Sequence, residues 1–279
     1  MTSKDRLAEA HERLTDAVEH LVSGEDWQQM LALAARLHRY SPNNCMLIRA
    51  QRPDATMLGG YRRWQSLGRQ VRKGEKGIAI LAPCVYRRRP VNEADEAERP
   101  ELARILRGFT VAFVFDISQT DGPPLPDVAP TLLDGDAPAE LWDRLATRVA
   151  AAGFALSRAD CSPANGRTDF AARTVVVQRD LASAQAAKTL AHELAHVLLH
   201  DGTEYVTGCR GRAEVEAESV AYLLCTAVGL PTDGYSFPYV ASWSAGDVDA
   251  VKATAEATIG CARDILRGAG LFDETGVAA

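Results

Sequence analysis

The chain has 279 residues, which is long enough for one large domain or two ordinary ones. Its residues are 47% hydrophobic and 24% charged, a composition typical of globular proteins, and no segment approaches the roughly 20 consecutive apolar residues of a membrane span. The first 21 residues are charged throughout and lack the apolar stretch of a secretory signal, so we expect a cytoplasmic protein with no membrane partner. Six singly scattered cysteines argue against a disulfide framework or a CxxC zinc site.

The charge distribution is strongly uneven, although the net charge is only −6. Between positions 36 and 89, thirteen Lys or Arg stand against two acidic residues, which gives this segment a net charge of +11 and leaves −17 on the remainder. Such asymmetry within one chain indicates a polyanionic partner.

The chain begins with helical patterns. Apolar residues recur at three- and four-residue steps over 1–22 and 25–39, which predicts two amphipathic helices separated by Ser23-Gly24. Ser41-Pro42 is expected to end the second helix.

Strands and a linker are predicted next. A glycine-punctuated stretch covers 59–77, and apolar runs at 78–86 and 109–117 predict two strands. Residues 121–138 contain five prolines and no periodic apolar pattern, which indicates a linker between domains.

The remaining residues are predicted to be mainly helical. We expect one strand at 174–178 and helices at 139–152, through the segment HELAHVLLH (192–200), at 213–228 and at 246–267. The predicted fold class is therefore α+β, with an N-terminal α+β domain at 1–120 and a mainly helical domain at 139–279.

The segment HELAHVLLH has the pattern of a metal site. His192 and His196 are four residues apart, so a helix presents both imidazoles on one face, and Glu193 directly follows the first. In zinc proteases this HExxH pattern binds the ion through the histidines, and the glutamate takes a proton from water as general base. The alternative is a purely structural helix, but burying two imidazoles and a carboxylate without a shared partner is costly. We therefore expect Zn²⁺ here.

A third protein ligand is expected from the segment 213–228. His200 continues the row of histidines too far along the axis to converge on the same ion, so we expect it beside the site or at the helix end. Of three glutamates in the segment, Glu216 falls within the apolar arc, and a carboxylate that faces the core requires a cation. Glu216 is therefore the expected third ligand, which leaves the fourth position open as in catalytic sites. Glu214 and Glu218 are expected to be solvated charges or partners of a ligand histidine.

The basic segment predicts a nucleic-acid surface. Residues 57–83 mix Arg and Lys with aromatic residues and glycines, and this mixture suits single strands, because cations neutralise phosphates while aromatic rings stack on bases. The alternative is that Trp64 belongs to the core and the arginines form a solvated face. The candidate DNA-binding residues are Tyr61, Arg62, Arg63, Trp64, Arg69, Arg72, Lys73 and Lys76.

Both halves resemble one known family, the ArdC-type antirestriction proteins. In the N-terminal half the resemblance rests on SPNNCMLI, GGYRRWQSLGRQVRKGEKGIAILAP and VFDISQT, which are similar to the family's single-stranded-DNA-binding domain. In the C-terminal half it rests on TLAHELAHVLLH and EVEAESVAYLL, which are similar to its zincin-like metallopeptidase domain, related to the ImmA/IrrE peptidases.

The resemblance implies residue roles and a function. It makes His192 and His196 zinc ligands, Glu193 the catalytic glutamate and Glu216 the third ligand of a His₂Glu, gluzincin-like site. It further implies protection of incoming plasmid or phage DNA against restriction, by coating of single strands and by proteolysis of an unknown protein substrate.

Two alternative functions stay open at this point. One is a sequence-independent coating protein for single-stranded DNA whose zinc domain is only structural. The other is a regulatory metalloprotease that cleaves a repressor. Glu193 favours an enzyme over the first alternative, because a structural zinc needs no general base, and the +11 segment argues against the second.

Overall fold

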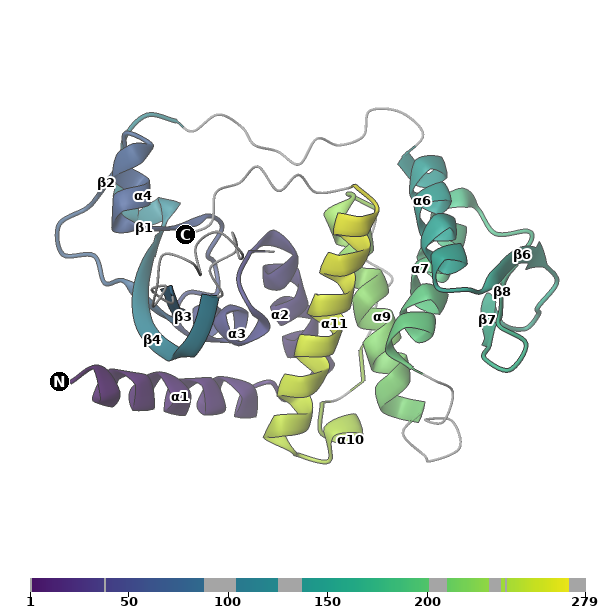
Figure 1. Cartoon of the computed structure of the whole chain (residues 1–279), viewed down its shortest axis with the longest axis horizontal. Coiled ribbons are helices and arrows are strands. Elements are labelled where there is room, and N and C mark those ends of the chain that lie inside the picture. The colour runs from purple at the N-terminus through teal and green to yellow at the C-terminus, as the bar shows by residue number, and fades with distance from the viewer. Residues whose placement is uncertain are drawn as a thin grey trace, which may run out of the picture. The chain divides into compact units, whose positions relative to one another are not determined.

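The computed structural model describes residues 2–37, 39–87, 104–124, 137–200, 210–230, 237–238 and 240–270 (Figure 1). The chain forms two compact units. The first unit contains Met1–Ala17 and Leu47–Gly122, and the second contains Val18–Met46 and Pro123–Ala279. Helices and strands occur together, which confirms the expected α+β class. None of the described helices is long and apolar enough to cross a membrane.

This division differs from the predicted domains at 1–120 and 139–279. Residues 18–46, which we expected in the N-terminal domain, group with the C-terminal half. Most of the expected linker, residues 125–136, lies outside the described residues.

An antiparallel sheet of order β1–β4–β3 forms the centre of the first unit. It contains β1 (Leu58–Gly60), β3 (Ile78–Arg87) and β4 (Arg104–Asp116), and the register places Val114 between Gly60 and Ile78. Successive residues of β4 alternate between the two faces of the sheet, so Val114 is buried whereas Phe113 is exposed.

Short elements complete the first unit around this sheet. Helix α4 (Tyr61–Ser66) follows β1, and the two-residue strands β2 (Gln70–Val71) and β5 (Thr120–Asp121) form a separate ladder. The 3₁₀ helix η1 (Ile117–Gln119) begins at Asp116, whose carboxylate accepts a hydrogen bond from the backbone N–H of Ser118. This cap joins the end of β4 to β5.

Two helices contain residues of both units. These are α1 (Ser3–Glu19) and α3 (Pro42–Gln51). The sequence pattern did not predict α3. Pro42 is its first residue, a position that tolerates proline because the missing N–H would have no helical partner. The Ser-Pro pair therefore separates two helices.

The second unit is built around α7 (Ser183–Leu199), which packs against α6 (Ala137–Ala151), α9 (Arg210–Ala227) and α11 (Val248–Gly268) (Figure 1). A short helix, α10 (Val240–Ser244), precedes α11. The sheet of this unit has the order β6–β8–β7, in which β6 (Ala155–Ala159) is parallel and β7 (Gly166–Asp169) antiparallel to β8 (Thr174–Gln178).

Helix α2 (Gly24–Arg36) belongs to the second unit because it packs on α9. The fully buried Trp27 donates an indole hydrogen bond of 2.9 Å to Ser219 Oγ. The start of α2 is fixed by a capping box, in which Ser23 and Asp26 exchange hydrogen bonds with each other's backbone N–H.

Candidate metal centre

Two adjacent helices supply the side chains of the centre. α7 carries the HExxH segment, and α9 carries the three glutamates of EVEAES. Both helices bury alanines, among them Ala191 and Ala217, and small side chains allow packed helices to approach closely. The side chains of one helix can therefore reach those of the other.

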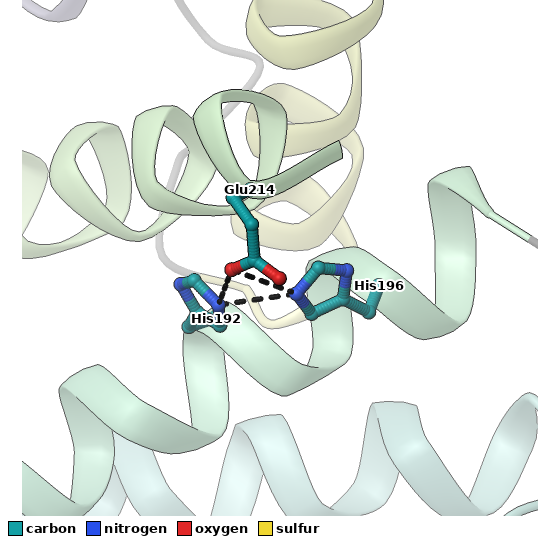
Figure 2. Close-up of side chains that lie close together, drawn as sticks. All are labelled: His192, His196 and Glu214. Carbon is teal, nitrogen blue, oxygen red and sulfur yellow. Dashed lines mark hydrogen bonds and ion pairs between the residues drawn. The ribbon is translucent and has the colours of Figure 1, made fainter. Parts of the chain in front are cut away.

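Three donor atoms converge between α7 and α9, as Figure 2 shows. The Nε2 atoms of His192 and His196 lie 3.1 Å apart, and Oε2 of Glu214 lies 3.4 Å from the first and 3.8 Å from the second. Two imidazole nitrogens and a carboxylate oxygen are ligands that suit a divalent transition metal. In the part of the chain that the structure describes, these residues form the one His, Cys, Asp and Glu cluster with metal-binding geometry.

The electrostatics of the cluster favour a cation. Burial alone would lower the pKa of His192, but hydrogen bonds to Glu214 and Glu218 raise this pKa to about 9. Burial and the neighbouring charge of His192 lower the pKa of His196. The neighbouring carboxylates therefore favour positive charge at the imidazole pair, and a divalent ion bound there would supply that charge in place of a proton.

The outer nitrogen of His192 has its own carboxylate partner. Nδ1 of His192 lies 3.1 Å from Oε2 of Glu218, and the other oxygen of Glu218 lies 3.3 Å from Lys188 Nζ. A proton on Nδ1 that is donated to Glu218 leaves the Nε2 lone pair directed at the cluster. Of the two roles expected for Glu218, the structure shows the contact with a histidine.

The outer nitrogen of His196 is oriented by a second imidazole. Nδ1 of His196 lies 3.0 Å from Nδ1 of His200, which is the C-cap residue of α7. Nε2 of His200 in turn lies 3.0 Å from Oε2 of Glu216. His200 therefore lies beside the cluster, where the sequence placed it.

Glu216 is buried, as its position in the apolar arc indicated, but the structure does not bring it to the imidazole pair. Its carboxylate accepts hydrogen bonds from Arg212 Nε at 2.8 Å and Thr254 Oγ1 at 3.2 Å, in addition to its contact with His200. Burial would raise the pKa of Glu216, but the bonds with His200 and Arg212 lower it. In this structure the carboxylate near both Nε2 atoms is therefore that of Glu214, whereas Glu216 is bonded to Arg212, Thr254 and His200.

Glu193 lies on the side of α7 that meets β7. Thr168 Oγ1 donates a 2.7 Å hydrogen bond to Oε2 of Glu193. Gly166 packs directly against the same side chain, since a Cβ added at Gly166 would lie 2.6 Å from Oε1 of Glu193. Burial raises the pKa of Glu193 more than the bond from Thr168 lowers it. Sequence reasoning missed Gly166 and Thr168, because nothing in the polar segment GRTD indicates contact with the HExxH helix.

Some of the candidate DNA-binding residues are exposed and others are buried. Tyr61 and the cations Arg62, Arg63, Lys73 and Lys76 are exposed. They lie on α4 and on the loop between β2 and β3.

Trp64 and Arg69, which were also predicted to contact DNA, are buried in the framework of the first unit. Trp64 is 1% exposed and its indole N–H donates to the carbonyl of Phe115, so its ring has no free face for a base. Arg69 is 9% exposed and its guanidinium bonds Thr120 and the carbonyl of Gly122. The aromatic-basic pattern did not distinguish side chains that support the surface from those that form it.

Arg72 is exposed, but its guanidinium already has protein partners. It donates to Glu75 at 2.7 Å, to the backbone carbonyl of Ser118 and to the carboxylate of Asp121. These bonds attach the β2–β3 loop to η1 and β5.

Comparison with known proteins supports the two-part reading of the chain. Residues 4–112 match the N-terminal domain of the anti-restriction factor ArdC, and residues 147–232 match a peptidase family, the IrrE N-terminal-like domain. The two matches cover separate parts of the chain, and the first of them is to the ArdC N-terminal domain. An uncharacterised Bacillus anthracis protein, pXO2-81, is 24% identical over 270 residues, which cover 85% of this chain but 46% of that protein. The chain thus spans about half the length of this curated relative.

Two crystal structures of the antirestriction ArdC protein from the R388 plasmid share this fold. The metal-free structure is 20% identical with a TM-score of 0.50, and the match covers 84% of this chain and 87% of the ArdC chain. The Mn(II)-bound structure is 23% identical with a TM-score of 0.50, and covers 84% and 90%. At this identity the likeness establishes the fold alone.

Proposed function

We propose that the chain is an antirestriction protein that binds single-stranded DNA and carries a metal-dependent endopeptidase, and that it protects incoming plasmid or phage DNA. We further propose that Zn²⁺ is the ion, that His192, His196 and Glu214 are its protein ligands, and that Glu193 is the general base. A cytoplasmic location remains a prediction from the sequence. The observation that supports the enzyme best is the convergence of three donor atoms beside Glu193.

The chemistry follows from the residues around the donors. A divalent ion held there would supply Lewis-acid polarisation of a peptide carbonyl. Glu193 would accept a proton from the attacking water and pass it to the leaving amine. Burial suits Glu193 to the role of base, because a carboxylate whose pKa is raised takes a proton from water more readily.

The Mn(II)-bound ArdC structure supports the proposal that this chain binds a divalent ion. First-row divalent ions share histidine and carboxylate ligands. Zn²⁺ remains our choice because two imidazoles, one carboxylate and an open position are typical of catalytic zinc. Metal analysis of the purified protein after dialysis against each ion would distinguish the two.

The basic surface supports the DNA-binding part of the proposal. Arg62, Arg63, Lys73 and Lys76 are exposed in the unit that matches the ArdC N-terminal domain. Exposed cations bind phosphates, and the affinity then falls steeply as salt is added.

A comparison of Glu193→Gln with wild type tests the enzyme. New protein N-termini would be quantified in a host lysate incubated with each protein, with and without single-stranded DNA. The exposed Glu12→Gln serves as a matched control for loss of one carboxylate. Cleavage by wild type and Glu12→Gln but not by Glu193→Gln is the expected result, and it would identify the substrate. If all three proteins bind zinc and DNA but give the same N-termini, the coating protein with a structural metal becomes the better account.

A further inference from the structure

Two exposed phenylalanines lie on one face of strand β4. Phe109 and Phe113 are 48% and 47% exposed, whereas Val114 on the opposite face is 6% exposed. The exposed large hydrophobic side chains among the described residues include three aromatic rings, Tyr61, Phe109 and Phe113, and all three lie in the first unit. Large apolar groups gathered on a water-facing surface indicate a binding site.

The β2–β3 loop packs its backbone at Gly77 against Phe113. A Cβ added at Gly77 would lie 2.9 Å from Cβ of Phe113 and 3.2 Å from Cζ of Phe115, so the backbone that follows Lys76 packs directly on the aromatic side of β4. Any larger residue at position 77 would separate the loop from these rings. Lys76 itself is exposed.

Hydrogen bonds hold this loop in position. Gln119 Nε2 donates to the carbonyl of Lys76 at 2.9 Å and to Oε2 of Glu75 at 3.0 Å. Arg72 binds the other oxygen of Glu75 at 2.7 Å. Glu75, the single acidic side chain of the loop, thus has partners within the protein, while Lys73 and Lys76 are exposed.

We propose that Phe113, together with Phe109 on the same strand and Tyr61 of the same unit, forms a stacking surface for the unpaired bases of a single-stranded polynucleotide whose phosphates contact Lys73 and Lys76. The positive charge of the two lysines favours a polynucleotide over other ligands, because it attracts phosphates while the aromatic rings can stack on unpaired bases. A duplex hides its base faces within the stack. This inference rests on the proposed function and assigns residues to its DNA-binding part.

Binding of a fluorescent oligothymidine to the full chain, measured by anisotropy over a range of salt concentrations, tests the inference. Loss of one stacked base is expected to weaken binding about tenfold in Phe113→Ala, with the slope of log affinity against log salt unchanged, because no phosphate contact is removed. Lys76→Ala should instead make that slope less steep by about 0.7. Val22→Ala, which removes an exposed apolar side chain from the second unit, should leave binding unchanged.

Phe113→Trp and Phe113→Leu separate stacking from a structural role. Phe113→Trp should retain affinity and show quenched tryptophan fluorescence on binding, whereas Phe113→Leu should be as weak as Phe113→Ala with an unchanged melting temperature. Wild-type affinity in Phe113→Leu, or preference of the wild-type protein for duplex, would overturn the stacking surface while DNA binding stands. No DNA binding by the wild-type protein would overturn the proposed function itself.

Discussion

Nδ1 of His196 lies 3.0 Å from Nδ1 of His200, one helical turn further along the chain. A ring nitrogen that donates to its neighbour leaves Nε2 of His196 as the lone pair directed at His192. The backbone of His200 is extended at the end of α7, and the other ring nitrogen of His200 lies 3.0 Å from Oε2 of Glu216. In the structure, His200 is thus placed to orient the imidazole of His196.

Replacing Glu214 and Glu216 should have opposite consequences. The Glu214 side chain is 43% exposed, so Glu214→Gln should lose metal with little change in melting temperature. The Glu216 side chain is 8% exposed and binds Arg212 and His200, so Glu216→Gln should destabilise the unit by about 3 kcal/mol and retain more metal. Metal content and thermal unfolding of both variants provide the measurement. Greater metal loss in Glu216→Gln would restore Glu216 as the ligand.

His200→Leu should weaken metal binding although all three ligands remain. Loss of a hydrogen-bonding partner behind a ligand histidine typically costs about 10- to 100-fold in metal affinity. Competition with a chromophoric chelator measures this affinity directly, without a peptidase assay. Equal affinity in the variant and wild type would contradict the orienting role.

Thr168→Val should slow cleavage while leaving zinc bound. The substitution keeps the shape of Thr168 but removes the hydroxyl that donates to Glu193. Since that bond lowers the pKa of Glu193 against burial, its loss should raise this pKa and shift the acidic limb of the rate profile to higher pH.

Thr168→Ser restores the hydroxyl and is the matched control for Thr168→Val. Thr168→Ser should recover both the cleavage rate and its pH profile. Both are measured with the substrate that the comparison of wild type with Glu193→Gln identifies. An unshifted profile in Thr168→Val would show that the bond does not act on catalysis.

Asp116 should make the stability of the first unit pH-dependent. Burial alone would raise the pKa of this 1% exposed carboxylate, but hydrogen bonds from Ser118, Thr56 and Met57 outweigh that effect and lower it. Its stabilising contribution is therefore present above the unfolded pKa of about 3.9 and is lost as pH falls through the lower folded value.

Asp116→Asn should destabilise the unit at pH 7 by about 1–3 kcal/mol, because a charged hydrogen-bond acceptor is lost. Urea unfolding of wild type and Asp116→Asn at pH 7 and at pH 3 should show this difference shrinking in acid. A constant difference would mean that the charge of Asp116 is not the source of its effect.

Sequence predicted the parts of the structure whose pattern is local. β8 occupies 174–178 as expected, and α2, α6, α9 and α11 lie within a few residues of their predicted ranges, because apolar periodicity reports directly on one buried face. β6 and β7 were missed, since both are largely exposed and lack alternating apolar residues. The burial of Glu216 was also predicted. The hydrogen-bond partners of Glu216 could not be predicted, because Thr254 and His200 belong to other parts of the sequence.

The Trp27–Ser219 contact has a consequence for how the protein can be divided. The second unit takes Val18–Met46 from before Leu47–Gly122 and the rest of its residues from after it, so Leu47–Gly122 is an insertion in the sequence of the second unit. A fragment that starts at residue 139 would lack the helix that covers α9. Cutting the backbone between residues 124 and 137 would leave two pieces that both contribute to the core of the second unit, because Val18–Met46 would be on one piece and α9 on the other.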